Sequence, residues 1–167
     1  TLNIKHKDSS EILKRLLKKT DVLVQNLAPS AMEKLGLDYD SLKDSYEKLI
    51  VCNISGYGPS GPYQNKKAYD LLIQAESGFL SVTGTKEEIV KSGISIADTA
   101  AGMQAFSAIL AAIIQRGKSG KGSRIDISML EAMVEWMGFP LFYSYDGAAP
   151  PERTGADHAS IYPYGIF

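Results

Sequence analysis

The sequence has 167 residues, a length typical of one domain, and 44% hydrophobic and 22% charged residues, which excludes a disordered chain. Its 18 Lys and Arg balance 19 Asp and Glu, so no basic excess exists to bind a nucleic acid, and no nucleic-acid partner is expected. The single cysteine, Cys52, excludes an intrachain disulfide and a cysteine-based zinc site.

The first half of the chain alternates helix and strand patterns. Apolar residues recur on one stripe of a helix that Ser9 or Ser10 caps, and two β-branched runs indicate buried strands. The elements expected here are a helix at 10–19, a strand at 21–25, a loop from Asn26 to Pro29, a helix at 30–35 closed by Gly36, a short helix from Asp38 with Leu42 facing inward, and a strand at 49–54.

The second half begins with a loop rich in Gly and Pro. The elements expected here are a loop at 55–67, a helix at 69–78, a short strand at 80–82, a long helix at 98–116 stopped by Gly117, a turn at 119–122, a strand at 124–127, a helix at 128–139 and a loop-like aromatic tail. Such alternation predicts an α/β fold with a mainly parallel sheet flanked by helices. Ligands of such sheets bind at the carboxyl ends of the strands, which favours the loops at 25–30 and 55–70.

Several familiar sites are not supported. The histidines, His6 and His158, lie far apart without metal-ligand spacing, so no metal site is predicted. The stretch 119–122 lacks the spacing of a phosphate loop, and prolines interrupt the Gly-x-Gly-x-x-Gly spacing at 56–61. No run of about 18 apolar residues and no signal peptide is recognised, so no membrane partner is expected.

Asp98 is the strongest candidate for chemistry, because it stands where the long helix is expected to begin. The simplest interpretation is a helix N-cap, a position that Asp favours. The alternative is a nucleophile, because a helix N-terminus stabilises an anion and the small neighbours at 97–102 leave room for a substrate.

Five further polar residues are weaker candidates. Asn26 is either a turn residue or a contact to a ligand at a strand end. Lys34, Lys66 and Lys67 are by default solvated, although a lysine in the Gly/Pro loop suits a phosphate. Asp70, at the start of a predicted helix, is explained by compensation of the helix dipole.

Taken together, a series of short motifs in order resembles the family III CoA-transferases. This family, also called CaiB/BaiF, includes formyl-CoA transferase, carnitine CoA-transferase and alpha-methylacyl-CoA racemase. The motifs that carry the resemblance are Asp21-Val-Leu-Val-Gln-Asn-Leu-Ala-Pro29, Met32-Glu-Lys-Leu-Gly36, Ile54-Ser-Gly-Tyr-Gly58, Gly61-Pro-Tyr63, Tyr69-Asp70, Gln74-Ala-Glu-Ser-Gly78, Thr83-Gly84, Ile96-Ala-Asp-Thr-Ala-Ala-Gly102, Ile109-Leu-Ala-Ala112, Gly120-Lys-Gly122 and Ile125-Asp-Ile-Ser-Met-Leu-Glu-Ala132.

The resemblance implies a Rossmann-like fold within a two-domain protein that forms an interlocked homodimer. Residues 1–167 would then be part of the large, CoA-binding and catalytic domain, without the N-terminal segment and the C-terminal small domain. The start at Thr1 rather than Met agrees with a piece of a longer protein. The expected location is the cytoplasm, with the mitochondrial matrix as the alternative.

The resemblance also implies roles for residues. Asp98 would attack the thioester of an acyl-CoA donor and form an aspartyl-enzyme intermediate, from which CoA passes to a small carboxylic acid. Acyl-CoA would be a substrate, with no permanently bound cofactor. The residues implied in CoA binding are Asn26, Leu27, Lys34, Leu35, Lys67, Tyr69 and Asp70.

Two alternatives to the transferase are kept. In the racemase branch a histidine stands before the acidic residue, and this chain has Tyr69, whose ordinary pKa near 10 makes a poor base. A racemase-like enzyme is therefore disfavoured, and proton exchange at the α-carbon of an acyl-CoA would revive it. A non-catalytic CoA-binding domain would bind CoA without forming a covalent adduct.

Overall fold

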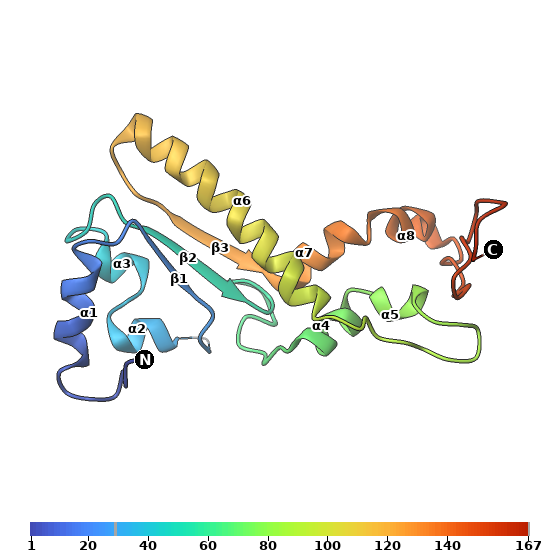
Figure 1. Ribbon diagram of the computed structural model, residues 1–167, viewed down its shortest axis with the longest axis horizontal. Coiled ribbons are helices and arrows are strands. Elements are labelled where there is room, and N and C mark those ends of the chain that lie inside the picture. The colour runs from blue at the N-terminus through green and yellow to red at the C-terminus, as the bar shows by residue number, and fades with distance from the viewer. Residues whose placement is uncertain (29, 167) are drawn as a thin grey trace. The chain divides into compact units, whose positions relative to one another are not determined.

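The structure is a computed structural model that describes residues 1–28 and 30–166. The chain forms two compact units, one of residues 1–55 with 105–127 and one of residues 56–104 with those from Ser128 on. Pro29, expected in the first loop, and Phe167 lie outside the described residues. The elements are α1 (Ser9–Leu17), β1 (Val22–Gln25), α2 (Ala31–Leu35), α3 (Tyr39–Leu42), β2 (Ile50–Ser55), α4 (Asp70–Glu76), α5 (Phe79–Val82), α6 (Ile96–Ser119), β3 (Arg124–Ser128), α7 (Met129–Trp136), α8 (Gly138–Tyr143) and a 3-10 turn (Tyr145–Gly147) (Figure 1).

The sheet has three strands in the order β1-β2-β3, and the arrows of all three point the same way in Figure 1. Parallel pairing joins Val22 to Ile50 and continues to the end of β1. Ile50, Val51 and Cys52 are fully buried because β2 is the central strand. The predicted α/β fold with a parallel sheet flanked by helices is confirmed.

The edge strand β1 is less buried than its apolar sequence indicates. Val24 is 51% exposed, and the other residues of β1 are half-buried. The prediction of a buried strand is therefore correct for β2 and wrong for β1, since an edge strand is paired on one side alone.

The first unit has a core that α1, α3 and β2 share. Leu17, Leu42, Leu49 and Val51 form its buried cluster, and the inward position predicted for Leu42 is confirmed. The stripe predicted on α1 is only partly buried, because Leu16 of that stripe is 59% exposed.

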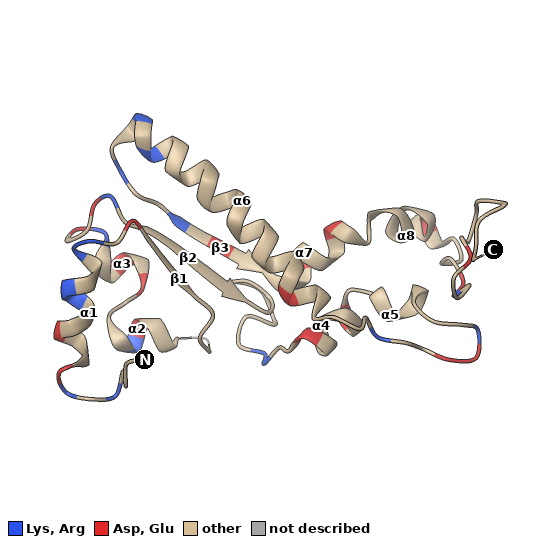
Figure 2. Cartoon of the chain, in the orientation of Figure 1, with Lys and Arg blue, Asp and Glu red and all other residues tan. Residues whose placement is uncertain are grey.

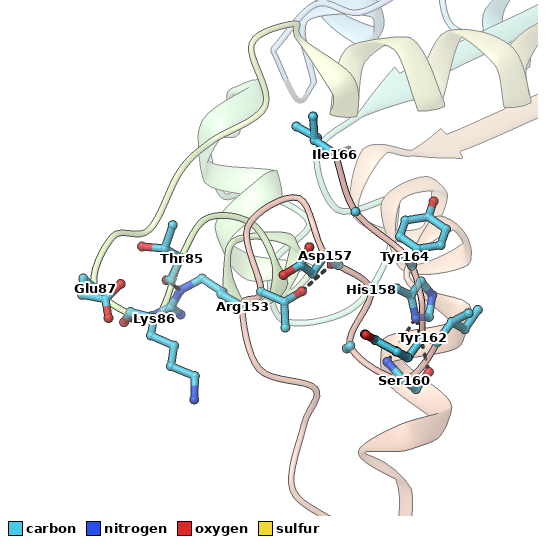
Figure 3. Close-up of a pocket in the computed structure, with 14 residues that line it drawn as sticks. Thr85, Lys86, Glu87, Arg153, Asp157, His158, Ser160, Tyr162, Tyr164 and Ile166 are labelled. Atoms are coloured by element: carbon cyan, nitrogen blue, oxygen red, sulfur yellow. Dashed lines mark hydrogen bonds between the residues drawn. The ribbon is translucent and has the colours of Figure 1, made fainter.

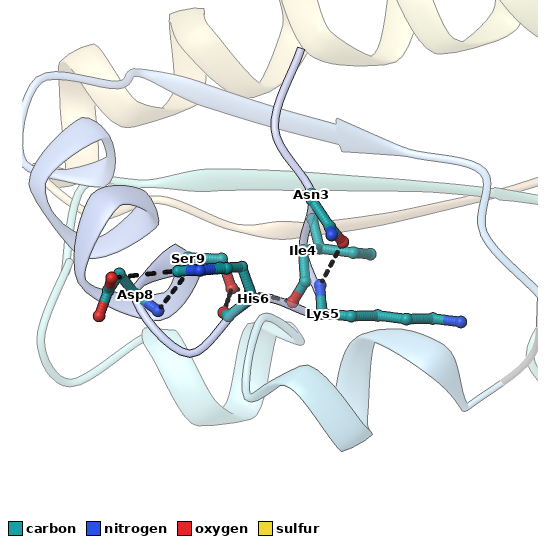
Figure 4. A network of polar contacts seen from close by, with 6 residues as sticks. All are labelled: Asn3, Ile4, Lys5, His6, Asp8 and Ser9. Carbon is teal, nitrogen blue, oxygen red and sulfur yellow. Dashed lines mark hydrogen bonds and ion pairs between the residues drawn. The ribbon is translucent and has the colours of Figure 1, made fainter.

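The start of α1 differs from the expected serine cap. Asp8 occupies the N-cap position, and its side chain makes no capping hydrogen bond. The Ser9 hydroxyl instead lies within hydrogen-bond distance of two preceding carbonyls, 2.9 Å from that of Ile4 and 2.6 Å from that of His6 (Figure 4). Ser9 thus ties α1 to the segment before it rather than capping the helix.

The end of α2 and the start of α3 lie where the sequence predicts them. Gly36 has φ 63° and its N–H returns to the Glu33 carbonyl, which ends α2. Asp38 accepts the Ser41 N–H at 3.1 Å and so caps α3. The Ser41 hydroxyl, which also donates to this carboxylate, is the main reason that the pKa of Asp38 is lowered.

The second unit contains α4, α5, α7 and α8. Ile73 of α4 and Met133 of α7 are fully buried in it. The segment predicted as a strand at 80–82 is helical and belongs to α5, so that prediction is wrong. A short, mostly apolar run suits a buried strand and a helix equally. Here Gly78, at φ 82°, precedes a helical turn that the Thr83 hydroxyl closes on the Phe79 carbonyl at 2.9 Å.

The long helix α6 extends beyond both predicted ends, from Ile96 to Ser119. Gly117 does not stop it; Gly120, at φ 72°, follows its last residue. By length and composition alone, with a mean hydropathy of 1.4 over 18 residues, α6 meets the criteria for a helix that could cross a membrane, which core helices of soluble proteins also meet.

The predicted helix at 128–139 is divided. It begins as expected, with the Ser128 hydroxyl accepting the Glu131 N–H at 3.3 Å, but α7 ends at Trp136. A second helix, α8, follows at Gly138–Tyr143 and occupies the start of the predicted loop-like tail.

Candidate active site

Asp98 is the third residue of α6, in the second unit. Its neighbours Ala97, Ala100 and Ala101 face inward and are buried, whereas Asp98 and Gly102 are exposed. Small residues therefore surround an accessible carboxylate, as the sequence predicts.

Asp70, the first residue of α4, is the group that caps α6. Its Oδ1 accepts the Ala97 N–H at 2.8 Å and the Asp98 N–H at 3.4 Å. The interpretation of Asp98 as the N-cap is therefore wrong, and compensation of its own helix dipole does not fully explain Asp70. The structure brings these two predicted site residues together.

Gln74 is a member of this cluster that sequence reasoning missed. It is fully buried, and its Nε2 donates to Asp70 Oδ2 at 2.6 Å. The sequence offers one indication of this role. Gln74 lies four residues after Asp70 and next to Ile73, and this spacing places its polar side chain on the inner face of α4.

The electrostatics of Asp98 differ from the sequence-based expectation. A helix N-terminus was expected to keep this carboxylate ionised, but partial burial, and then the charge of Asp70, raise the pKa of Asp98. The carboxylate of Asp70 is close enough to exert its effect because it accepts the backbone N–H of Asp98 at 3.4 Å. Asp98 is therefore a stronger base than an ordinary aspartate.

The loop before α4 is anchored by Lys66. Its ammonium pairs with Glu76 at the end of α4, and this pair raises the pKa of Lys66 and lowers that of Glu76. The ammonium also lies 4.4 Å from the ring centre of Tyr63. The default interpretation of Lys66 as solvated is therefore incomplete, while Lys67 is exposed beside it.

Tyr69 occupies the N-cap position of α4 and is 70% exposed. Its side chain makes no capping hydrogen bond. It follows the exposed Lys67 and directly precedes Asp70, so these predicted site residues lie along one stretch of backbone.

Asn26 and Leu27 follow the carboxyl end of β1 in the first unit, and both are exposed. Gln25 holds their backbone: its Oε1 accepts the Leu27 N–H at 2.7 Å, and its Nε2 donates to Asn53 of β2 at 3.0 Å. Asn53 in turn donates to Asp126 of β3 at 2.9 Å. This ladder across three strands fixes the loop where a ligand was expected.

Lys34 and Leu35 lie on α2, also in the first unit. Both line a pocket of about 760 Å³ among α1, α2 and α3, which Lys7 and Lys14 line as well. Figure 2 shows the basic residues of α1 on this part of the chain. Three lysines thus belong to the lining of this pocket.

A second pocket, of about 830 Å³, lies in the second unit between the loop at 85–87 and the tail from Arg153 on (Figure 3). His158 lines it, and its ring stacks on Phe139 with 5.5 Å between ring centres. None of the predicted site residues lines this pocket.

Two other chemistries find no support in the part of the chain that the structure describes. No three His, Cys, Asp or Glu side chains there gather into a group that could hold a metal. Cys52 is fully buried, and this burial, with the charge of Asp126, raises the pKa of its thiol, which disfavours a reactive thiolate.

Comparison with known proteins agrees with the fold and with the resemblance in the sequence. The model of CoA-transferase family III matches residues 1–167, and the chain belongs to this family. It is 38% identical to an acyl-CoA transferase of Fusarium pseudograminearum, over 100% of this chain and 37% of that protein. It is 34% identical to the human succinyl-CoA:glutarate CoA-transferase, over 99% of this chain and 38% of that protein.

Solved structures agree. A crystal structure of a CaiB/BaiF family protein from Brucella suis matches with a TM-score of 0.92 and 32% identity, over 99% of this chain and 44% of that one. The chain therefore spans about two-fifths of the length of these relatives.

Proposed function

We propose that this chain is the part of a CoA-transferase that carries the nucleophile, and that Asp98 attacks the thioester. The observation that carries the proposal is the exposed carboxylate of Asp98 among small residues at the start of α6, in a chain that the family model matches throughout. The raised pKa of Asp98 agrees with it for the ionised carboxylate, because the intrinsic nucleophilicity of a group rises with its pKa.

The proposed reaction has two exchanges. The Asp98 carboxylate attacks the acyl carbonyl and the C–S bond breaks. CoA departs as its thiolate, and an acyl-aspartyl anhydride remains on the enzyme. Attack of the thiolate on the Asp98 carbonyl releases the donor carboxylate and gives an aspartyl-CoA thioester. The acceptor carboxylate then attacks the aspartyl-CoA thioester, and the same steps run in reverse. The acceptor leaves as the new acyl-CoA and Asp98 is regenerated. One difficult exchange is thereby divided into several easier ones.

For CoA binding, the proposal keeps the residues that the sequence resemblance implies: Asn26, Leu27, Lys34, Leu35, Lys67, Tyr69 and Asp70. The basic pocket at Lys34 supports this assignment, because CoA is anionic through its phosphates and lysine binds phosphate as a point charge. Exposure of Lys67 and Tyr69 leaves both accessible to a ligand.

For the acceptor, the proposal names a small dicarboxylic acid. Relatives are named as enzymes of succinate and glutarate in Agrobacterium fabrum and of oxalate in Acetobacter aceti, and each of these acids has two carboxyl groups. The working form is proposed to be a homodimer, as the sequence resemblance implies.

The test is intact-mass measurement of the full-length protein after incubation with succinyl-CoA, with and without hydroxylamine. A hydroxylamine-sensitive adduct of CoA is expected on Asp98, absent in Asp98→Asn and retained in Asp44→Asn, a control at an exposed aspartate. If no donor forms an adduct while CoA still binds, the covalent mechanism is refuted. Exchange of the α-proton of an acyl-CoA would then identify a racemase-like enzyme, and its absence a CoA-binding domain.

A further inference from the structure

A chain of hydrogen bonds in the second unit links the loop before α6 to the first turn of that helix. The Ser92 N–H donates to Gln74 Oε1 at 2.9 Å, and Gln74 Nε2 donates to Asp70 Oδ2 at 2.6 Å. The other oxygen of Asp70 accepts the N–H groups of Ala97 and Asp98. Gln74 therefore connects two backbone segments through a side chain that solvent does not reach.

The surroundings of Gln74 permit one orientation of its amide. If the amide were reversed, Oε1 would face the carboxylate of Asp70, and the NH₂ group would face the Ser92 N–H. Neither contact would then form a hydrogen bond, and leaving buried polar groups unpaired costs folding free energy. The carboxylate of Asp70 is thus held from one side by Gln74 and from the other by α6.

We propose that Gln74 is a positioning residue for the nucleophile: by holding Asp70 against the first turn of α6, it fixes the place and the electrostatic surroundings of Asp98. The inference rests on the function proposed for Asp98. Gln74 touches no substrate in this scheme and acts through Asp70, whose carboxylate binds the Asp98 N–H directly.

Among the charged groups near the start of α6, Asp70 is the one that affects the pKa of Asp98. Its charge, after burial, raises the pKa of Asp98. The other charged groups on adjoining segments of the second unit are Glu76, which pairs with Lys66; Lys91, which donates to the Ser92 carbonyl; Glu131; and Glu135, which accepts from Gln104.

Two variants separate positioning from simple stabilisation. Gln74→Leu removes the donor to Asp70, so the carboxylate is free to turn away from α6. Asp70→Asn combined with Gln74→Glu keeps the hydrogen bonds, because the new amide donates to the new carboxylate, but places the charge one side chain further from Asp98. Gln104→Leu is the matched control, since it breaks an amide-to-carboxylate bond with Glu135 instead.

The experiment titrates Asp98 in the full-length protein by ¹³C NMR of labelled aspartate side chains, with Asp98→Asn to assign the signal. Its pKa is expected to fall toward the ordinary value in Gln74→Leu and in the double variant, and to stay unchanged in Gln104→Leu. The single-turnover rate of adduct formation in Gln74→Leu is expected to fall between about tenfold and a hundredfold, the cost of misplacing a reacting group by about 1 Å.

A titration of Asp98 in Gln74→Leu that superimposes on that of the parent protein would overturn the inference, even if the variant melts at a lower temperature. If Gln74→Leu does not fold, the double variant decides, and an unchanged pKa of Asp98 in it overturns the inference equally. Failure of the proposed function is recognised separately, because the parent protein would form no adduct while the titration could still be followed.

Discussion

The close approach of Gly56 to Ala68 yields a quantitative prediction for Gly56→Ala. A Cβ placed on Gly56 would lie 2.2 Å from the Cβ of Ala68, whereas two carbons pack at about 3.5–4.0 Å. The segment around Ala68 must therefore move by roughly 1.5 Å, the shortfall between these distances. Ala68 lies between Lys67 and Tyr69, so the movement reaches the proposed CoA-binding residues.

The expected loss has two parts. Overpacking costs about 1–3 kcal/mol of folding free energy, which exceeds the roughly 0.4–1 kcal/mol that Gly→Ala gains by restricting the unfolded chain. Displacement of the site by about 1 Å or more lowers the rate of acyl transfer by roughly a hundredfold.

Urea unfolding and single-turnover acyl transfer measure these two losses. The matched control is Gly117→Ala in α6, where nothing lies within 4 Å of the added Cβ, and this variant is expected to gain up to about 1 kcal/mol of stability. Unchanged stability and unchanged rate in Gly56→Ala would refute the reasoning.

Three further predictions concern stability. Ile73→Ala removes a fully buried side chain and is expected to cost about 2–5 kcal/mol in urea unfolding, whereas a cost below about 1 kcal/mol would contradict its place in the core. Asp38→Ala removes the cap on Ser41 and is expected to cost about 1 kcal/mol at neutral pH. Because the pKa of Asp38 is lowered, its contribution is present above the unfolded pKa and is lost as the pH falls, so the two proteins should converge in acid. Because the pKa of Asp98 is raised in the folded protein, the stability of the parent protein falls as the pH rises from the unfolded to the folded pKa of this carboxyl. Asp98→Asn should therefore raise the melting temperature at pH 7 but not at pH 3. Equal changes in melting temperature at both pH values would exclude ionisation of Asp98 as the cause.

Much of the fold could be predicted because it depends on short-range pattern. The β-branched run that becomes β2, the glycine after α2 and the aspartate before α3 each act within a few residues. Where a pattern is short and apolar, as at α5, the sequence does not distinguish helix from strand.

The candidate site was predicted less completely than the fold. Asp98 was singled out, but its interpretation as a cap was wrong because Asp70 supplies the carboxylate that binds the helix terminus. Gln74 was missed, since its position four residues after Asp70 indicates a polar residue on the inner face of α4 but does not reveal its second partner, Ser92, 18 residues away.

The sequence by itself determined the alternation of helices and strands, the parallel sheet and the position of an aspartate among small residues. Only the tertiary structure decided which carboxylate caps α6, how Gln74 connects to Ser92, and why the pKa of Asp98 is raised rather than lowered. The physical reason is distance along the chain: caps and turns join near neighbours, whereas Asp70 and Ala97 are 27 residues apart and meet only when α4 packs beside the start of α6.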